Sequence, residues 1–216
     1  MILALLLAAV TASPSPATAV EAERAFAADA KRIGQWTAFG RWAAPNALMF
    51  LPKPIDAREF FGKRADPKAP VEWWPNHSYV RCDGRTAINH GGAAWSQGFA
   101  TNFTTVWFKG STGWRWVYDG GQTVKQALPR DAAVEVKQAS CRSIPRRVAG
   151  SWAQTAALRA PDSAPLDAMA ALSADRSLAW RYQYDPASKY LMFRGWLWDG
   201  QRYALVIDQA IAPDPE

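Results

Sequence analysis

The chain has 216 residues, of which 49% are hydrophobic and 20% charged, and its formal net charge is +6. These are the proportions of an ordinary globular protein, so they exclude global disorder. The 12 tryptophans favour a rigid, sheet-rich core or an aromatic-lined cavity, because each indole buries a large area. The positive charge would permit nucleic-acid binding, but the basic residues are scattered and no nucleic-acid motif is present. We therefore expect no nucleic-acid partner.

Residues 1–19 predict a secretory signal peptide. The uncharged apolar run from Ile2 to Val10 is too short to span a bilayer, and Ala17-Thr18-Ala19 has the form of a cleavage site. The segment lacks the basic residue that usually precedes such a run. No later segment approaches the length of a membrane span. We therefore expect a periplasmic or secreted protein, cleaved near Ala19.

Two helices are predicted at the start of the mature chain. In residues 21–33 the apolar side chains recur at helical spacing and form one stripe; they are Ala22, Phe26, Ala30 and Ile33. Glu23 and the basic residues of this segment are expected to lie largely off the stripe. After a break at Gly34, a second helix is predicted to carry Trp36, Phe39 and Trp42. Both helices can cover one face of a sheet.

Residues 47–94 alternate strand and turn signals. Asp56, followed by Glu59 three residues on, has the form of a helix N-cap, so we interpret this carboxylate pair as a helix end and not as catalytic. Gly91 and Gly92 follow the last strand of this stretch. Their small size would let a backbone or a ligand come close, as the mouth of a cavity requires.

The strongest secondary-structure signal is a hairpin from Phe103 to Gly121. β-Branched and aromatic residues run up to a polar, glycine-containing turn and resume beyond it. Alternation along the second strand predicts that Trp114, Trp116 and Tyr118 share one face and that Asp119 lies on the other. One face has to be buried, and the other is available to line a cavity.

This hairpin and the elements before it resemble the NTF2-like superfamily, which includes SnoaL-like and ketosteroid-isomerase-like proteins. The resemblance is carried by TVWFKGSTGWRWVYDGG and by five earlier segments in the family's order: AERAFAADAKRIG, WTAFGRWA, ALMFLP, IDAREFF and WWPNHSYVRCDGRTAINHGG. It covers about residues 21–123, and the nearest likeness is to the DUF4440-type group. It implies an α+β fold of the NTF2-like/cystatin-like class, a cone-shaped curved antiparallel sheet packed with N-terminal helices. The corresponding domain is predicted at residues 20–125.

Residues 126–216 lie outside the resemblance and predict a β-rich C-terminal extension. Short helices are expected at Ser151–Leu158 and Leu166–Leu172. A β-meander follows, with strands at Ser177–Tyr184, Tyr190–Trp198 and Tyr203–Ile211. The pattern leaves open whether these strands extend the first sheet or form a separate lobe.

The two cysteines, Cys82 and Cys141, suggest a disulfide if the protein is exported, because an even, small number is typical of an oxidising compartment. Two buried free thiols are the alternative. The cysteine spacing fits no metal motif and the two histidines are far from an i, i+4 pair, so we expect no metal site. Motifs for nucleotide or other cofactors are also lacking, so no cofactor is expected.

Asp119 and His90 are the candidate catalytic residues. Enzymes of the resembled family use an aspartate, or a histidine with an aspartate, inside an apolar cone, where burial raises a carboxyl pKa and strengthens hydrogen bonds to a developing enolate. Asp119 could face the cone, or it could cap a turn or hold a backbone amide. His90, beside Gly91, could act as a general base, or it could be a wall residue with satisfied hydrogen bonds.

Three functions are compatible with these residues and with the resemblance. The favoured one is the binding of a small apolar or aromatic molecule in the cone, with side chains that are predicted to line it: Phe26, Trp36, Trp73, Tyr79, His90, Trp107 and Asp119. The second is an isomerase- or cyclase-like enzyme that uses Asp119 or His90 for proton transfer. The third is a non-catalytic assembly module that forms a homodimer through a sheet face.

Overall fold

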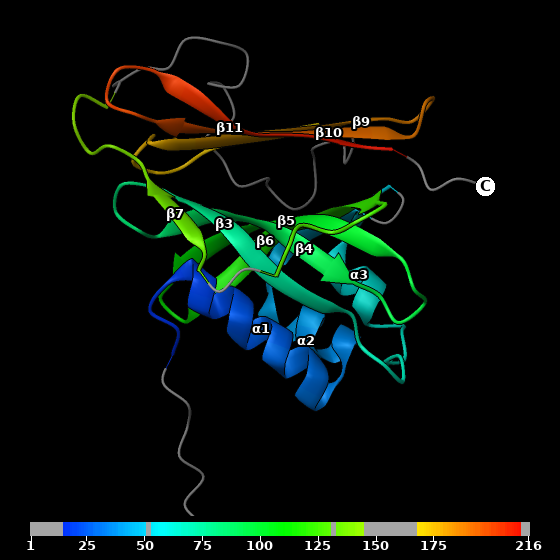
Figure 1. The fold of residues 1–216 in the computed structure, drawn as a ribbon. Coiled ribbons are helices and arrows are strands. Elements are labelled where there is room, and N and C mark those ends of the chain that lie inside the picture. The colour runs from blue at the N-terminus through cyan, green and yellow to red at the C-terminus, as the bar shows by residue number, and fades with distance from the viewer. Residues whose placement is uncertain (1–14, 51–52, 131–132, 145–167, 213–216) are drawn as a thin grey trace, which may run out of the picture.

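The computed structural model describes residues 15–50, 53–130, 133–144 and 168–212. Its elements form three layers: helices, a seven-stranded curved sheet and a four-stranded sheet, with the larger sheet in the middle (Figure 1). The predicted α+β class, with an extra C-terminal sheet, is confirmed. Most of the predicted signal peptide and the helix predicted at Ser151–Leu158 lie outside the described residues.

The helical layer contains α1 (Ala19–Ile33), α2 (Gln35–Trp42) and α3 (Ala57–Phe61). Thr18 and Glu21 form a capping box at the start of α1. The Asp56 carboxylate accepts hydrogen bonds from the first backbone N–H groups of α3, so its interpretation as a helix cap is confirmed. None of the described helices has the length and apolarity that a membrane crossing demands.

The larger sheet has the strand order β2-β1-β6-β5-β4-β3-β7. Its strands are β1 (Ala43–Phe50), β2 (Pro54–Asp56), β3 (Glu72–Val80), β4 (Thr86–Ala94), β5 (Ala100–Gly110), β6 (Gly113–Val124) and β7 (Glu135–Gln138). The predicted hairpin is confirmed as β5 and β6. The sheet is mixed and not wholly antiparallel, because β1 pairs with β6 and β7 with β3 in parallel. Since β7 joins this sheet, the sheet continues past residue 125.

The smaller sheet contains β8 (Ala168–Leu172), β9 (Leu178–Asp185), β10 (Tyr190–Trp198) and β11 (Tyr203–Ile211), all antiparallel. The predicted meander is confirmed as β9 to β11. The helix predicted at Leu166–Leu172 is wrong, because its described part is strand β8. Pairing with β9 outweighs the helical preference of this alanine-rich segment.

The smaller sheet packs on the face of the larger sheet that is turned away from the helices (Figure 1). The Tyr118 ring of β6 stacks on the rings of Phe193 and Tyr182, at centroid distances of 4.7 and 5.7 Å. A Cβ atom at Gly195 would come within 2.8 Å of the Ile88 side chain, so the absence of a side chain at Gly195 lets Ile88 pack directly on the β10 backbone. The C-terminal strands therefore form a separate layer and do not extend the first sheet.

A β-bulge in β6 separates two aromatic residues that strict alternation would place together. Val106 faces Tyr118 across the β5–β6 pair and Trp107 faces Trp116, so Val117 has no partner in β5. As a result Trp116 points to the helices, whereas Tyr118 points to the smaller sheet. The prediction that Trp114, Trp116 and Tyr118 share a face is wrong. After the bulge, Asp119 points to the helix side.

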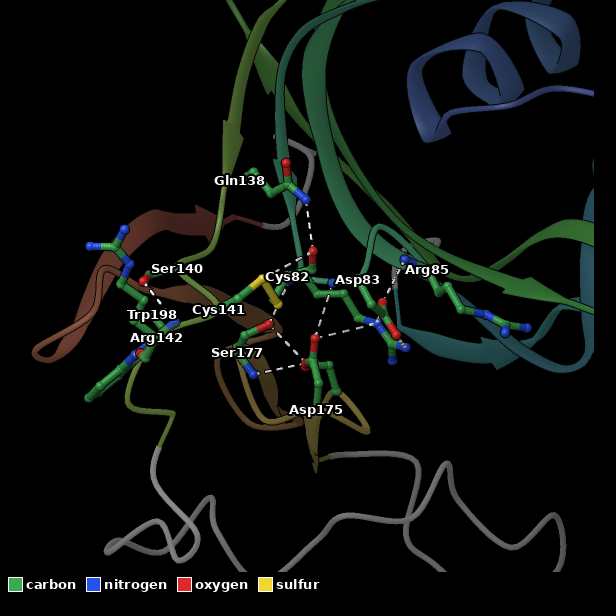
Figure 2. Close-up of a disulfide and its surroundings, with 12 residues drawn as sticks. Cys82, Asp83, Arg85, Gln138, Ser140, Cys141, Arg142, Asp175, Ser177 and Trp198 are labelled. Carbon is green, nitrogen blue, oxygen red and sulfur yellow. Dashed lines mark hydrogen bonds and ion pairs between the residues drawn. A yellow bond between two sulfur atoms is a disulfide. The ribbon is translucent and has the colours of Figure 1, made fainter.

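A disulfide between Cys82 and Cys141 joins the turn after β3 to the segment after β7 (Figure 2). Close to it, the N–H of Cys82 donates to the Ser177 hydroxyl, just before β9, over 2.8 Å. The N–H of Ser140 donates to the carbonyl of Trp198, at the end of β10, also over 2.8 Å. The disulfide therefore lies at a junction that fastens the two sheets to each other.

Candidate functional site

A cavity of about 290 Å³ opens on the helix side of the larger sheet. Seven aromatic side chains contribute to its wall: Trp36, Phe39, Phe50, Trp73, Trp95, Phe99 and Phe103. Trp95 and Phe99 belong to the β4–β5 turn and stack on each other at a centroid distance of 5.3 Å. Ile211 and Ala212, at the end of the smaller sheet, also line the cavity. The site is therefore built from both parts of the chain.

Asp119 is the carboxyl group of the cavity wall. The hydroxyl of Thr105, its cross-strand neighbour in β5, donates a hydrogen bond of 2.9 Å to its carboxyl oxygen. Asp119 is enclosed by protein but keeps part of its surface open to the cavity. Burial, and next the charge of Glu23, raise the Asp119 pKa from 3.8 to about 7, against the Thr105 hydrogen bond, which lowers it. Near neutral pH this carboxyl can therefore accept or donate a hydrogen bond.

Glu23, in α1, is a second and fully buried carboxyl group. One oxygen accepts the indole N–H of Trp73 over 2.9 Å. The other accepts the indole N–H of Trp107 over 2.6 Å and the amide N–H of Asn89 over 3.1 Å. Burial raises the Glu23 pKa, and the three donated hydrogen bonds oppose that rise. Glu23 is thus tied to Trp73, which lines the cavity, and to two fully buried side chains, Asn89 and Trp107.

Glu23 was not predicted as a site residue, and the expectation that it lies off the apolar stripe is wrong. The side chains of α1 that are buried include Ala22, Glu23, Phe26 and Ala30, so the buried face is wider than the predicted apolar stripe. The available signal was its position three residues before Phe26, which is one helical turn away on the same face. A carboxyl at such a position needs buried donors, which tryptophans supply here.

The structure brings three of the predicted ligand-binding residues to the cavity: Trp36, Trp73 and Asp119. Phe26 and Trp107 are fully buried behind this wall, in an aromatic cluster whose rings meet edge to face. The Phe26 ring lies 4.7 Å from that of Trp73, and the Trp107 ring lies 5.8 Å from that of Trp42, centroid to centroid. These two residues support the wall without lining the cavity, so their assignment as ligand contacts is wrong.

His90 and Tyr79 lie on the other face of the larger sheet, so their assignment to the cavity is also wrong. The His90 ring hydrogen-bonds the Thr104 hydroxyl over 3.0 Å, and that hydroxyl donates to Gln209 of β11 over 2.9 Å. Tyr79 pairs with Ile88, which contacts the smaller sheet. The alternation of β4 explains this: Asn89 points to Glu23, so His90 points away.

His90 is largely buried beneath the smaller sheet, and its chemistry follows from that position. Burial lowers the His90 pKa to about 4, so the imidazole is neutral at physiological pH. Because His90 lies across the sheet from Asp119, it is not an acid–base partner for that carboxyl. The alternative interpretation of His90, a residue with satisfied hydrogen bonds, describes it better.

Gly91 and Gly92 do not form the mouth of the cavity. Both are buried, and a Cβ atom at Gly91 would lie 2.0 Å from the carbonyl oxygen of Trp74. A Cβ atom at Gly92 would lie 2.6 Å from the carbonyl oxygen of Leu128. The predicted close approach is therefore made by other backbone segments of this chain, at Trp74 and Leu128.

No protein-family model and no curated protein matches the chain. Solved structures match it over about half its length. One is a putative ketosteroid isomerase from Parabacteroides distasonis ATCC 8503, 16% identical, which covers 50% of this chain and 90% of its own, with a TM-score of 0.41. Another is an NTF-2 like protein of unknown function from Silicibacter pomeroyi DSS-3, 17% identical, covering 49% and 93%, with a TM-score of 0.38.

A third is the CamKII hub homology domain of Chlamydamonas reinhardtii, 20% identical, covering 48% of this chain and 94% of its own, with a TM-score of 0.36. The second of these structures is itself described as NTF-2 like, the superfamily that the sequence resembles. This likeness concerns the fold only.

Proposed function

We propose that this protein binds a small, largely apolar or aromatic molecule in the cavity on the helix side of the larger sheet. The observation that carries the proposal is the cavity itself, about 290 Å³ in volume, walled by aromatic rings and containing Asp119. Small-molecule sites typically combine such apolar walls with a few polar groups that orient the ligand. Asp119, which accepts a hydrogen bond from the buried hydroxyl of Thr105, supplies such a polar group.

We also propose that binding takes place outside the cytoplasm. The apolar run at Ile2–Val10 and the Ala17-Thr18-Ala19 sequence support export. The Cys82–Cys141 disulfide supports it independently, because structural disulfides persist in oxidising compartments. A periplasmic or secreted location therefore fits both observations.

Filling the cavity is expected to abolish binding. Gly121 lines the cavity, and a Cβ atom there would meet only ordinary contacts, the nearest 3.5 Å away. Gly121→Phe should therefore fold and place its ring in the cavity. We expect the fluorescent probe N-phenyl-1-naphthylamine to bind the parent protein saturably and the variant at least about 10-fold more weakly.

The matched control is Gly110→Phe. Gly110 ends β5 away from the cavity, and its Cβ would likewise meet no atom closer than 3.7 Å. This variant should bind the probe as the parent does. Equal binding by the Gly121→Phe variant, or no saturable binding by the parent, would contradict the proposed function.

A second candidate function, proton transfer by Asp119, is favoured by the pKa of about 7. A carboxylate in an apolar cavity is a stronger base than one in water. The probe is 5-nitrobenzisoxazole: the base takes the proton on ring carbon, the N–O bond breaks, and a cyanophenolate forms. We expect accelerated ring opening that increases with pH around an apparent pKa near 7. Asp119→Asn should reduce the rate to background; an unchanged rate would exclude this candidate.

The third candidate, an assembly module that uses the sheet face, does not fit the layer arrangement. The face of the larger sheet away from the helices is covered by β9 to β11 of the same chain, with Tyr118 and Ile88 in the interface. A homodimer through that face would require the smaller sheet to leave. A homodimer that uses another surface stays a prediction.

A further inference from the structure

We propose that the ligand is an aromatic molecule with one acidic group, and that Arg64 binds this group at the mouth of the cavity. The inference rests on the proposed function, because it takes the cavity as the binding site. It adds a charge requirement that the aromatic wall alone does not impose.

Arg64 follows α3 and lines the cavity while its side chain remains exposed. The guanidinium carbon lies 3.8 Å from the centroid of the Phe60 ring and 5.9 Å from that of Trp36. Stacking on a ring restrains the plane of the guanidinium and leaves the N–H groups on its edge able to donate. An acidic group could then receive two parallel hydrogen bonds while its aromatic body enters between Trp36 and Trp73.

Arg64 has no counter-charge in the part of the chain that the structure describes. The acidic residue nearest in sequence, Asp66, is already engaged at the start of α2. Its carboxylate accepts the backbone N–H groups of Trp36 and Thr37, over 2.5 and 3.1 Å, and the Thr37 hydroxyl over 2.6 Å. The geometry therefore presents a stacked, oriented cation that is not neutralised by a neighbouring carboxylate.

The charge of the cavity lining agrees with an acidic ligand. Among the described lining residues the ionisable groups are Arg64 and Asp119. Because burial raises the Asp119 pKa to about 7, this carboxyl is protonated in about half of the molecules at pH 7 and in most of them one pH unit lower. The lining is then net positive, so a cationic ligand would meet a like charge, and an anionic ligand would meet Arg64 and a neutral hydrogen-bond donor.

Two fluorescent probes with one ring skeleton test the charge requirement. N-phenyl-1-naphthylamine is neutral, and 8-anilinonaphthalene-1-sulfonate carries the same rings with one acidic group. We expect Arg64→Gln to weaken sulfonate-probe binding about fivefold or more and to weaken neutral-probe binding by a clearly smaller factor, because only the sulfonate loses a charge-assisted contact. Lys63→Gln, which removes the adjacent exposed charge outside the cavity, should change neither affinity.

The outcomes separate the two proposals. If both probes bind and Gly121→Phe excludes them, but Arg64→Gln changes both affinities equally or neither, the acidic-ligand inference is overturned and the cavity remains the binding site. If the Gly121→Phe variant binds both probes as tightly as the parent does, the proposed function fails and the inference fails with it. An equal loss in the Arg64→Gln and Lys63→Gln variants would assign the effect to general surface charge and also overturn the inference. Arg64→Lys, which keeps the charge but not the planar fork, should recover only part of the affinity.

Discussion

Asp119→Asn is expected to stabilise the protein at pH 8 and to leave its stability unchanged at pH 3. The Asp119 pKa is about 7 in the folded protein and 3.8 as a reference value, so the folded state holds the proton more tightly. Well below pH 3.8 the carboxyl is protonated in both states, so its titration does not change the free energy of unfolding. As the pH rises to 7, only the unfolded state loses its proton, so the free energy of unfolding falls. At about 1.4 kcal/mol per pH unit, the loss reaches roughly 4 kcal/mol, and asparagine avoids it.

The measurement is urea unfolding, followed by tryptophan fluorescence, at several pH values between 3 and 8. The parent and the Asp119→Asn variant should diverge progressively from pH 4 upward. Asp185→Asn is the control with the opposite sign. Asp185 is exposed and its pKa is lowered by hydrogen bonds from Ser188 and Ala187, so its replacement should slightly destabilise the protein at pH 8. A constant difference between the parent and Asp119→Asn across this range would contradict the prediction.

Glu23→Ala is expected to destabilise the protein by about 3 kcal/mol or more. The substitution removes the acceptor of three buried N–H groups, on Trp73, Trp107 and Asn89, and each buried donor without a partner costs about 1–3 kcal/mol. In the uncleaved chain Asn89 keeps a second hydrogen bond, to the carbonyl of Ala19, which limits its share there. Urea unfolding at pH 7 measures the effect.

Two further variants show whether the acceptor itself is responsible. Glu23→Gln keeps the volume but replaces one oxygen by a donor that faces an N–H, so an intermediate loss of about 1–2 kcal/mol is expected. Glu59→Ala removes an exposed glutamate from α3 and should have little effect. A Glu23→Ala variant as stable as the Glu59→Ala variant would refute this role of Glu23. Glu23→Gln should also lower the Asp119 pKa, because it removes the neighbouring charge that raises it.

Features that depend on local sequence signals were predictable. The β5–β6 hairpin follows from β-branched and aromatic residues on either side of a glycine-containing turn, and the β9–β11 meander follows from the same pattern. The cap at Asp56 follows from one side chain and its nearest backbone N–H groups. For Asp119 the sequence left two alternatives, facing the cavity or capping a turn, and the first of them assumed an unbroken alternation.

Features that depend on distant parts of the chain were not predictable in the same way. The bulge at Val117 turns the residues that follow it to the opposite face from the one that alternation predicts, and the sequence from Trp114 to Asp119 contains no signal for it. His90 was predicted to line the cavity because the sequence of β4 does not show which of its faces is turned to the helices. That orientation is set by the packing of the smaller sheet on the other face. Arg64 lies in a polar, proline-containing loop whose residues carry no signal of the Phe60 ring beneath it.

The C-terminal strands do more than cover a sheet. Ile211 and Ala212 line the cavity, and Gln209 of β11 accepts a hydrogen bond from Thr104 of β5, so docking of the smaller sheet and completion of the ligand site are one structural event. Thermodynamic linkage then applies in both directions: a ligand that contacts Ile211 must tighten the docking of the second layer by the same factor by which docking improves its affinity. A substitution in the interface between the sheets, far from any ligand atom, would thereby change affinity without altering a single ligand contact.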